Sequence, residues 1–383
     1  IKGQSARLLC AYVYADAGEG ESTQDLVFAG HNMIAENGTV LASSNRFENG
    51  IIYADIDLER LVSDRRRMNT CRIENPREKY DYMDFELKEE SLSLKRPVDP
   101  APFIPADEKE RAERCEEIFT IQAMGLKKRM AHTGCTHAVV GISGGLDSTL
   151  ALLATVRAFD LLKLPRKQIL TVTMPCFGTT DRTYTNACSL AKKLGTTLRE
   201  VNIREAVAGH FKDIGHDPEK KDITYENSQA RERTQVLMDI ANDNGALVIG
   251  TGDMSELALG WATYNGDHMS MYGVNASIPK TLVRHLVRYY ADTCGEGELR
   301  TVLLDVLDTP VSPELLPPED GAISQKTEDL VGPYELHDFF LYQILRFGSR
   351  PAKIFRMALL AFDGQYSRET ILKWLKVFYR RFF

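Results

Sequence analysis

The chain has 383 residues, a formal net charge of −7 at pH 7, 43% hydrophobic residues and 26% charged residues. This length allows two or three domains, and the composition is typical of a globular protein. The acidic balance argues against a general nucleic-acid-binding protein, and the chain contains no apolar run that could span a membrane. We therefore expect neither a nucleic-acid nor a membrane partner. Seven scattered cysteines without C-x-x-C spacing predict reduced thiols and a cytoplasmic location.

Residues 1–70 are predicted to be rich in β-structure. The expected elements are a strand over 8–14, a hairpin over 32–44 that turns at Glu36-Asn37-Gly38, a strand over 51–56 and a helix beginning at 57–61. Such a segment makes a poor core by itself. Together with the absence of an initial Met, this leads us to expect that Ile1 is not the natural start.

A linker is predicted over residues 71–107. Residues 72–94 are highly charged, and the four prolines that follow exclude a long helix or a central strand. An amphipathic helix is predicted over 106–129, and it leads into a main domain that we place at 108–383.

From residue 137 onward, strands and helices alternate. The predicted order is strand 137–142, helix 147–162, strand 168–174, helix 181–194, strand 197–203, helices 204–212 and 224–244, strand 246–251 and helix 254–260. This order predicts an α/β fold with a doubly wound parallel sheet and helices on both faces. In such sheets, ligands bind where the strand order reverses, so the loops after the first and fourth strands are expected side by side. Residues 281–383 are predicted to be mostly helical, with a proline-rich break over 310–318.

The loop after the first strand has the sequence Ser-Gly-Gly-Leu-Asp-Ser, from Ser143 to Ser148. Paired glycines let the backbone close around a phosphate, and a helix N-terminus favours negative charge. Ser143 and Ser148 add hydroxyl donors, and Asp147 can hold a metal ion shared with the phosphates. The loop lacks the Gly-Lys-Ser/Thr end of a P-loop. The alternative is an ordinary glycine-rich turn, but the match favours phosphate binding, and the loop resembles that of ATP pyrophosphatases.

Further polar residues follow in the same domain. Asn227 and Arg231 lie four residues apart, so both can reach one ligand from one face of a helix, although a solvated helix is the simpler reading. Glu256, after Gly250-Thr251-Gly252-Asp253, is a plausible metal ligand. Asp267 and Lys280 lie in loop contexts.

In this order, these segments resemble the synthetase domain of NAD synthetases, from about residue 112 to 383. The resemblance rests on the first loop, E-N-x-Q-A-R at 226–231, G-T-G-D-x-S-E at 250–256 and the spacing from Asp267 to Lys280. It implies a Rossmann-like fold of the adenine nucleotide alpha-hydrolase type. Residues 1–70 resemble the end of a nitrilase-like glutaminase domain through segments 5–7, 11–14 and 18–22.

The resemblance also implies roles for individual residues. Asp147 and Lys280 are the implied catalytic residues, and Mg²⁺ would be bound by Asp147 and Glu256. The implied ATP-binding residues are Ser143, Gly144, Gly145, Asp147, Ser148, Thr251, Lys280 and Ser312. Asn227, Arg231 and Asp267 would bind deamido-NAD. The matching residues of a late helix, implied to be structural, are Tyr334, Glu335, Asp338 and Leu341.

The implied reaction is ATP-dependent amidation of deamido-NAD to NAD through an acyl-adenylate, with release of AMP and pyrophosphate. In the intact protein, ammonia would come from glutamine, through a Glu-Lys-Cys glutaminase triad that lies upstream of this segment. This chain is expected to use free ammonia. The implied assembly is a homodimer of synthetase domains within a larger homo-oligomer. Two alternatives stay open: another ATP pyrophosphatase amidotransferase such as GMP synthetase, and a non-catalytic ATP-binding fragment.

Overall fold

The computed structural model describes residues 1–22, 24–70, 81–88, 93–266, 268–295, 297–309, 315–316 and 330–383. The chain forms two compact units. The first comprises Ile1–Asp99 and Tyr342–Ser367, and the second comprises Pro100–Leu341 and Arg368–Phe383. These units are groups of residues in mutual contact, and they do not test the expected domain boundaries at residues 70 and 107. Those boundaries stay predictions.

The first unit contains a small antiparallel sheet with strand order β1-β2-β3. Its elements are α1 (Lys2–Leu8), β1 (Ala11–Tyr14), β2 (Met33–Glu36), β3 (Thr39–Ser43), α2 (Leu58–Arg67), the end of α12 and α13 (Pro351–Ala361). The predicted hairpin is confirmed. Asn37 and Gly38 both have positive φ, 42° and 83°, which is the backbone that a tight two-residue hairpin turn requires.

Two sequence-based expectations for this unit are wrong. Helix α1 ends at Leu8, and Leu9 has left-handed backbone (φ 47°), so the expected strand over 8–14 begins only at Ala11. The expected strand over 51–56 is absent from the described residues, and Ile51 is exposed. An apolar run forms a strand only where tertiary structure supplies a neighbouring strand, which local sequence does not reveal.

The second unit is built on a parallel sheet with strand order β6-β5-β4-β7-β8. The strands are β4 (His137–Gly141), β5 (Ile169–Thr173), β6 (Thr197–Glu200), β7 (Ala246–Gly250) and β8 (Tyr272–Gly273). The first four are the predicted strands, whereas the two-residue β8 was not predicted. The order reverses at β4, so the loops after β4 and β7 are neighbours, as expected for a doubly wound sheet.

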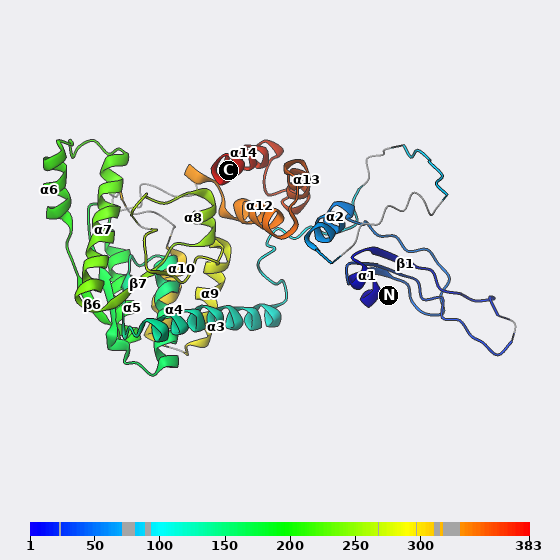
Figure 1. Ribbon diagram of the computed structural model, residues 1–383, viewed down its shortest axis with the longest axis horizontal. Helices are drawn as coiled ribbons and strands as arrows, with labels where there is room; N and C mark the ends of the chain where they lie inside the picture. The colour runs from blue at the N-terminus through cyan, green and yellow to red at the C-terminus, as the bar shows by residue number, and fades with distance from the viewer. Residues whose placement is uncertain are drawn as a thin grey trace. The chain divides into compact units, whose positions relative to one another are not determined.

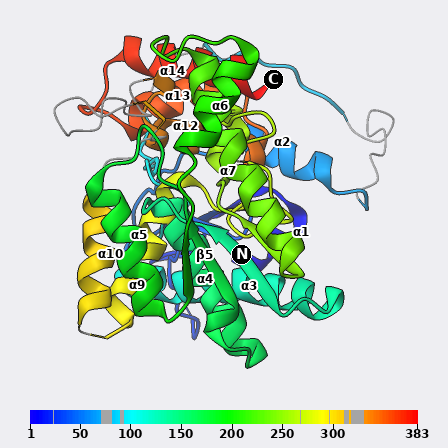
Figure 2. The same ribbon diagram turned by 90° about the vertical axis from the view of Figure 1, so that its left-hand side faces the viewer.

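Helices cover both faces of this sheet (Figure 1). Alternate residues of β4 point to opposite faces: Ala138 and Val140 join the core of α3, α4 and α9, while Val139 joins that of α6 and α7. Figure 2 shows α5, α9 and α10 side by side. The helices are α3 (Glu108–Thr133), α4 (Leu146–Leu162), α5 (Asp181–Leu194), α6 (Arg204–Ile214), α7 (Ile223–Asp243), α8 (Met254–Leu259), α9 (Lys280–Thr293), α10 (Glu298–Asp308), α12 (Tyr334–Phe347) and α14 (Arg368–Phe382).

In the described part of the chain, no helix is both long and apolar enough to cross a bilayer. Most of the predicted proline-rich break over 310–318 lies outside the described residues.

His337 of α12 is buried in an aromatic cluster of the second unit. Its ring stacks on Phe378, with centroids 6.0 Å apart, and meets Trp374 edge-on at 6.1 Å. Its Nε2 donates to the carbonyl of Val331 at 2.8 Å. Burial lowers the pKa of His337 to about 4, because the charged imidazolium would lose its hydration.

This burial predicts a loss of stability in acid. The unfolded histidine has a pKa of about 6.5, so between this value and about 4 the unfolded chain binds more protons than the folded one. The free energy of unfolding should therefore fall by about 2 kcal/mol between pH 7 and pH 5 on account of this residue. Urea titrations at both values check this against His337→Gln, whose curve should be flatter by that amount. Equal pH dependence of the two proteins contradicts the assignment.

Candidate active site

The loop after β4 forms the first wall of the site. It leads directly into α4, whose N-cap is Gly145, so the free N–H groups and the positive end of the helix dipole lie at this loop. The hydroxyls of Ser143 and Ser148 lie 3.2 Å apart, and Ser143 also accepts a hydrogen bond from the backbone N–H of Gly145 at 3.2 Å. The arrangement is that of an anion-binding turn.

Gly144 is required by the backbone of this loop. Its φ is +86°, and a Cβ built on it would lie 2.1 Å from the carbonyl oxygen of Thr183 in α5. The loop therefore packs directly against the backbone of a neighbouring helix, and any side chain at this position would force the two apart.

The loop after β7 forms the second wall. Asp253 is the N-cap of α8 and makes a capping box with Glu256: its Oδ1 accepts from the Glu256 N–H at 2.9 Å, and Glu256 Oε2 accepts from the Asp253 N–H at 3.4 Å. The box holds both carboxylates at the start of one short helix.

Lys280, the first residue of α9, joins the two walls. Its Nζ lies 2.8 Å from Asp147 Oδ2 and 2.6 Å from Asp253 Oδ2. A third carboxylate oxygen, Oε1 of Glu256, lies 2.8 Å from the same ammonium. We call Asp147, Asp253, Glu256 and Lys280 the ion cluster. Asp253 is completely buried, and the Lys280 side chain is only 5% exposed.

Burial and charge act in opposite directions in the ion cluster. Burial by itself would lower the pKa of Lys280, but the carboxylates of Asp147, Glu256 and Asp253 together raise it well above its ordinary value. Burial raises the pKa of Asp253 and of Glu256, and their mutual repulsion adds to it for Asp253. Three carboxylates facing one ammonium leave an excess of negative charge, so the cluster attracts a further cation.

The residues present fit a divalent cation. One carboxylate oxygen from each of Asp147, Asp253 and Glu256 lies within 4.8 Å of the other two. Asp147 Oδ1 is buried and has no hydrogen-bond partner among the residues that the structure describes. Carboxylate oxygens are the ligands that Mg²⁺ prefers, usually one or two together with substrate phosphates.

Asn275 fastens the two loops to each other. Its side-chain Nδ2 donates to the carbonyl of Asp147 at 2.9 Å and to that of Thr251 at 3.1 Å. Its Oδ1 accepts from Gln122 of α3 at 3.0 Å. Because Asn275 is fully buried, each of these bonds is shielded from water.

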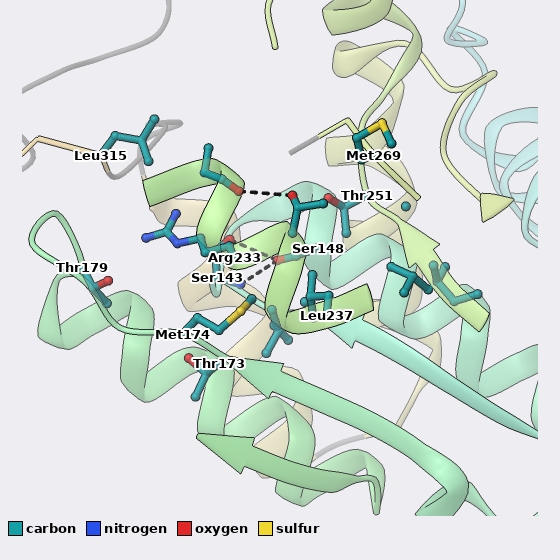
Figure 3. A pocket seen from close by; sticks show the side chains of 17 residues that line it. Ser143, Ser148, Thr173, Met174, Thr179, Arg233, Leu237, Thr251, Met269 and Leu315 are labelled. Carbon is teal, nitrogen blue, oxygen red and sulfur yellow. Dashed lines mark hydrogen bonds between the residues drawn. The ribbon is translucent and has the colours of Figure 1, made fainter. Parts of the chain in front are cut away.

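A cavity of about 210 Å³ opens beside the first loop (Figure 3). Its polar lining includes Ser143 and Ser148, which Figure 3 shows next to each other, and Arg233 of α7. Leu237 and Met174 form part of its apolar lining. A mixed cavity of this kind next to an anion-binding turn suits a nucleotide.

The structure brings most of the predicted ATP and metal residues together. Ser143, Ser148 and Thr251 line the cavity, and Asp147, Glu256 and Lys280 meet in the ion cluster. Two predicted residues, Ser312 and Asp267, lie outside the described residues.

The predicted dinucleotide residues of α7 contact the segment after α8. Asn227 Oδ1 accepts from the hydroxyl of Thr263 at 3.2 Å, and Arg231 Nε donates to the carbonyl of Tyr264 at 3.1 Å. They therefore face the segment that leads to Asp267, but their contact with a ligand stays a prediction.

Sequence reasoning missed three residues. Asp253 has no predicted role beyond its place in the G-T-G-D-x-S-E motif at 250–256, although an Asp followed three residues later by Glu is a capping signal that places both carboxylates together. Arg233 lies one turn of α7 beyond Ala230, which also lines the cavity. No local signal identifies Asn275, because its role depends on three distant segments.

The fold and the site define a doubly wound α/β protein with a nucleotide-type site at the point where the strand order reverses. Residues 118–358 match the family model described as NAD synthase. The chain belongs to the NAD synthase family.

The curated relatives that the chain matches are named as NAD(+) synthetases too. The chain is 42% identical over 413 aligned positions to a glutamine-dependent NAD(+) synthetase from Mycobacterium leprae, covering 100% of this chain and 61% of the relative. The corresponding protein of Thermotoga maritima is 30% identical, covering 97% and 59%. The chain thus spans about three fifths of the length of these relatives.

Solved structures share the fold. A glutamine-dependent NAD(+) synthetase from Cytophaga hutchinsonii superposes with a TM-score of 0.56 at 20% identity, covering 100% of this chain and 59% of that one. An NMN synthetase from Francisella tularensis gives 0.52 at 21% identity, covering 70% and 93%.

The backbone of the first loop predicts a contrast between adjacent glycines. Gly144→Ala should lower the free energy of unfolding by about 2–4 kcal/mol, because the new Cβ meets backbone and φ is positive. Gly145→Ala, with φ −88° and only the Ser143 hydroxyl 3.3 Å from its Cβ, should change it by less than about 1 kcal/mol. Guanidinium unfolding of both variants measures this, and equal losses contradict the packing described.

Proposed function

We propose that this chain catalyses the ATP-dependent amidation of deamido-NAD to NAD, with release of AMP and pyrophosphate. The observation that carries the proposal is the buried ion cluster beside the anion-binding loop that runs from Ser143 to Ser148. Membership of the NAD synthase family and the names of the curated relatives support it.

In the proposed first step, the pyridine carboxylate of deamido-NAD attacks the α-phosphorus of ATP in line. Pyrophosphate leaves into the loop of Ser143, Gly144, Gly145 and Ser148, where N–H groups and hydroxyls hold its charge. Lys280, Thr251 and Ser312 are proposed to contact the phosphates. Lys280 lies at the meeting point of both loops, so its ammonium is positioned to stabilise negative charge that develops there.

Mg²⁺ is part of this proposal, with Asp147 and Glu256 as its ligands and Asp253 as a third carboxylate beside them. When bound, the ion supplies positive charge that neutralises the phosphates. The unpartnered Asp147 Oδ1 and the excess negative charge of the ion cluster support its binding here.

In the proposed second step, ammonia attacks the acyl carbon and AMP leaves. This chemistry depends on positioning and charge, so it requires no nucleophilic side chain. Asn227, Arg231 and Asp267 are proposed to hold the dinucleotide in place, and the contacts of Asn227 and Arg231 with Thr263 and Tyr264 order that side of α7.

We further propose that residues 1–70 are the end of a nitrilase-like glutaminase domain, and that glutamine is the source of ammonia in the intact protein. For the chain of residues 1–383 we propose free ammonia as the nitrogen source. A homodimer of synthetase domains, within a larger homo-oligomer, and a cytoplasmic location complete the proposal; six free cysteines in the described residues accord with that location.

The reaction predicts ammonia-dependent formation of NAD and AMP in equal amounts from ATP and deamido-NAD. Chromatography of nucleotides measures both products. Parallel reactions with xanthylate and with nicotinate mononucleotide as acceptors distinguish other amidotransferases. Turnover of xanthylate alone would refute the proposal in favour of a GMP synthetase, and ATP binding without any AMP release would identify a non-catalytic module.

The role proposed for Asp147 predicts that its loss slows the first step, adenylate formation. Asp147→Ala should lower the rate of adenylate formation by about 10²- to 10³-fold, because it removes a carboxylate from both the metal site and Lys280. Asp160→Ala is the matched control: it removes a carboxylate from the same helix, but one that pairs with Arg166 in a half-exposed position. Exchange of labelled pyrophosphate into ATP measures the step, and equal rates in the two variants exclude the role given to Asp147.

A further inference from the structure

A fourth carboxylate, that of Asp338 in α12, lies behind the ion cluster. It is 2% exposed and accepts three hydrogen bonds. Its Oδ1 accepts from the hydroxyl of Ser255 at 2.5 Å, and its Oδ2 accepts from the N–H and the hydroxyl of Thr281 at 2.9 and 2.6 Å. Both partners are neighbours of ion-cluster residues.

The contact with Thr281 supplies a cap to α9. This helix begins at Lys280, and its N-cap is Pro279, whose side chain offers no acceptor for the free N–H groups. The N–H of Lys280 donates to Ser255 Oγ at 2.9 Å, and that of Thr281 donates to Asp338. A carboxylate from another helix thus takes the place of the missing local cap.

The same carboxylate also contacts α8, because Ser255 belongs to that helix. Ser255 lies between Asp253 and Glu256, and its hydroxyl donates to Asp338 while it accepts from the Lys280 backbone. Asp338 therefore connects the two helix starts whose side chains form the ion cluster. The N–H of Met254, which bonds to the carbonyl of Ile278 at 2.9 Å, is a second link between these segments.

Capping a helix with a buried carboxylate costs free energy, because the charged group loses its hydration. Burial raises the pKa of Asp338, although the hydroxyls of Ser255 and Thr281 oppose this by stabilising its charged form. A serine in place of Pro279 would satisfy the helix locally. What a local cap could not do is hold the starts of α8 and α9 at one separation.

We propose that Asp338 is a positioning residue of the active site: through Ser255 and Thr281 it sets the distance between Lys280 and the carboxylates of α8. The inference rests on the proposed function for its catalytic consequence, but its geometric consequence, the affinity of the carboxylates for a divalent cation, is independent of the acceptor substrate.

The test uses Asp338→Asn, Ser255→Ala and the double variant. Asp107→Asn is the matched control, because Asp107 also caps a helix, α3, by accepting the Glu110 N–H at 2.8 Å, but far from Lys280 in sequence and without contact to the ion cluster. Three quantities are measured on each protein: the unfolding midpoint, the dissociation constant of Mn²⁺ by electron paramagnetic resonance, and kcat and KM for AMP release.

We expect Asp338→Asn to weaken Mn²⁺ binding and to lower kcat, the latter by about 10- to 100-fold, with a smaller change in KM for ATP. The double variant should lose little more than either single one, since both changes break the same connection. Asp107→Asn should keep wild-type Mn²⁺ binding and kcat.

An unfolding midpoint that falls while Mn²⁺ affinity and kcat stay at wild-type values shows a merely structural role and overturns the inference. Strictly additive effects of Asp338→Asn and Ser255→Ala on Mn²⁺ binding overturn it as well. If Asp338→Asn does not fold, Ser255→Ala and Thr281→Val, each lacking one hydroxyl of the same network, decide by the same readouts. Should the wild-type protein release no AMP, the proposed function fails, whereas the Mn²⁺ measurements still decide the positioning role.

Discussion

The ammonium of Lys280 among three carboxylates is the interaction on which the rest of the site depends. Removing these charges from water is costly, and only their mutual contact offsets the cost. Loss of Lys280 would leave three carboxylates facing one another without a counter-charge, so the segments that carry these groups are bound to a single arrangement. The same group has an excess of negative charge, which suits the cation that we propose to bind there.

The sheet explains how these charges come together. With strand order β6-β5-β4-β7-β8, the chain leaves β4 and β7 in opposite directions, and their carboxyl ends open onto one crevice. The loop after β4 supplies an anion-binding turn and Asp147, while the loop after β7 supplies Asp253 and Glu256. Neither loop is a site alone, because the first has a single carboxylate beside its anion-binding turn, whereas the second has two carboxylates without such a turn.

Buried polar side chains then set the separation of these segments. Asn275 bonds to carbonyls of both loops, and Asp338 bonds to the starts of α8 and α9. Such groups are poor contributors to stability compared with apolar residues of the same size, but their hydrogen bonds have direction. They therefore fix the separation of the segments that they connect, because a hydrogen bond prefers one distance and one direction whereas apolar contact does not.

Local sequence determined the elements that carry their own signal. The apolar runs of β4, β5 and β7, the hairpin turn at Asn37-Gly38 and the loop from Ser143 to Ser148 were predictable, because periodicity, turn chemistry and glycine spacing act over a few residues. Strand pairing depends on distant segments. For this reason a strand was wrongly predicted over 51–56, and the two-residue β8 was not predicted. Only the tertiary structure decided that Lys280 pairs with Asp147, 133 residues earlier, and that Asp253 serves the ion cluster besides capping α8. These contacts arise because a parallel sheet gathers the ends of distant strands at one edge, where side chains meet that no local pattern connects.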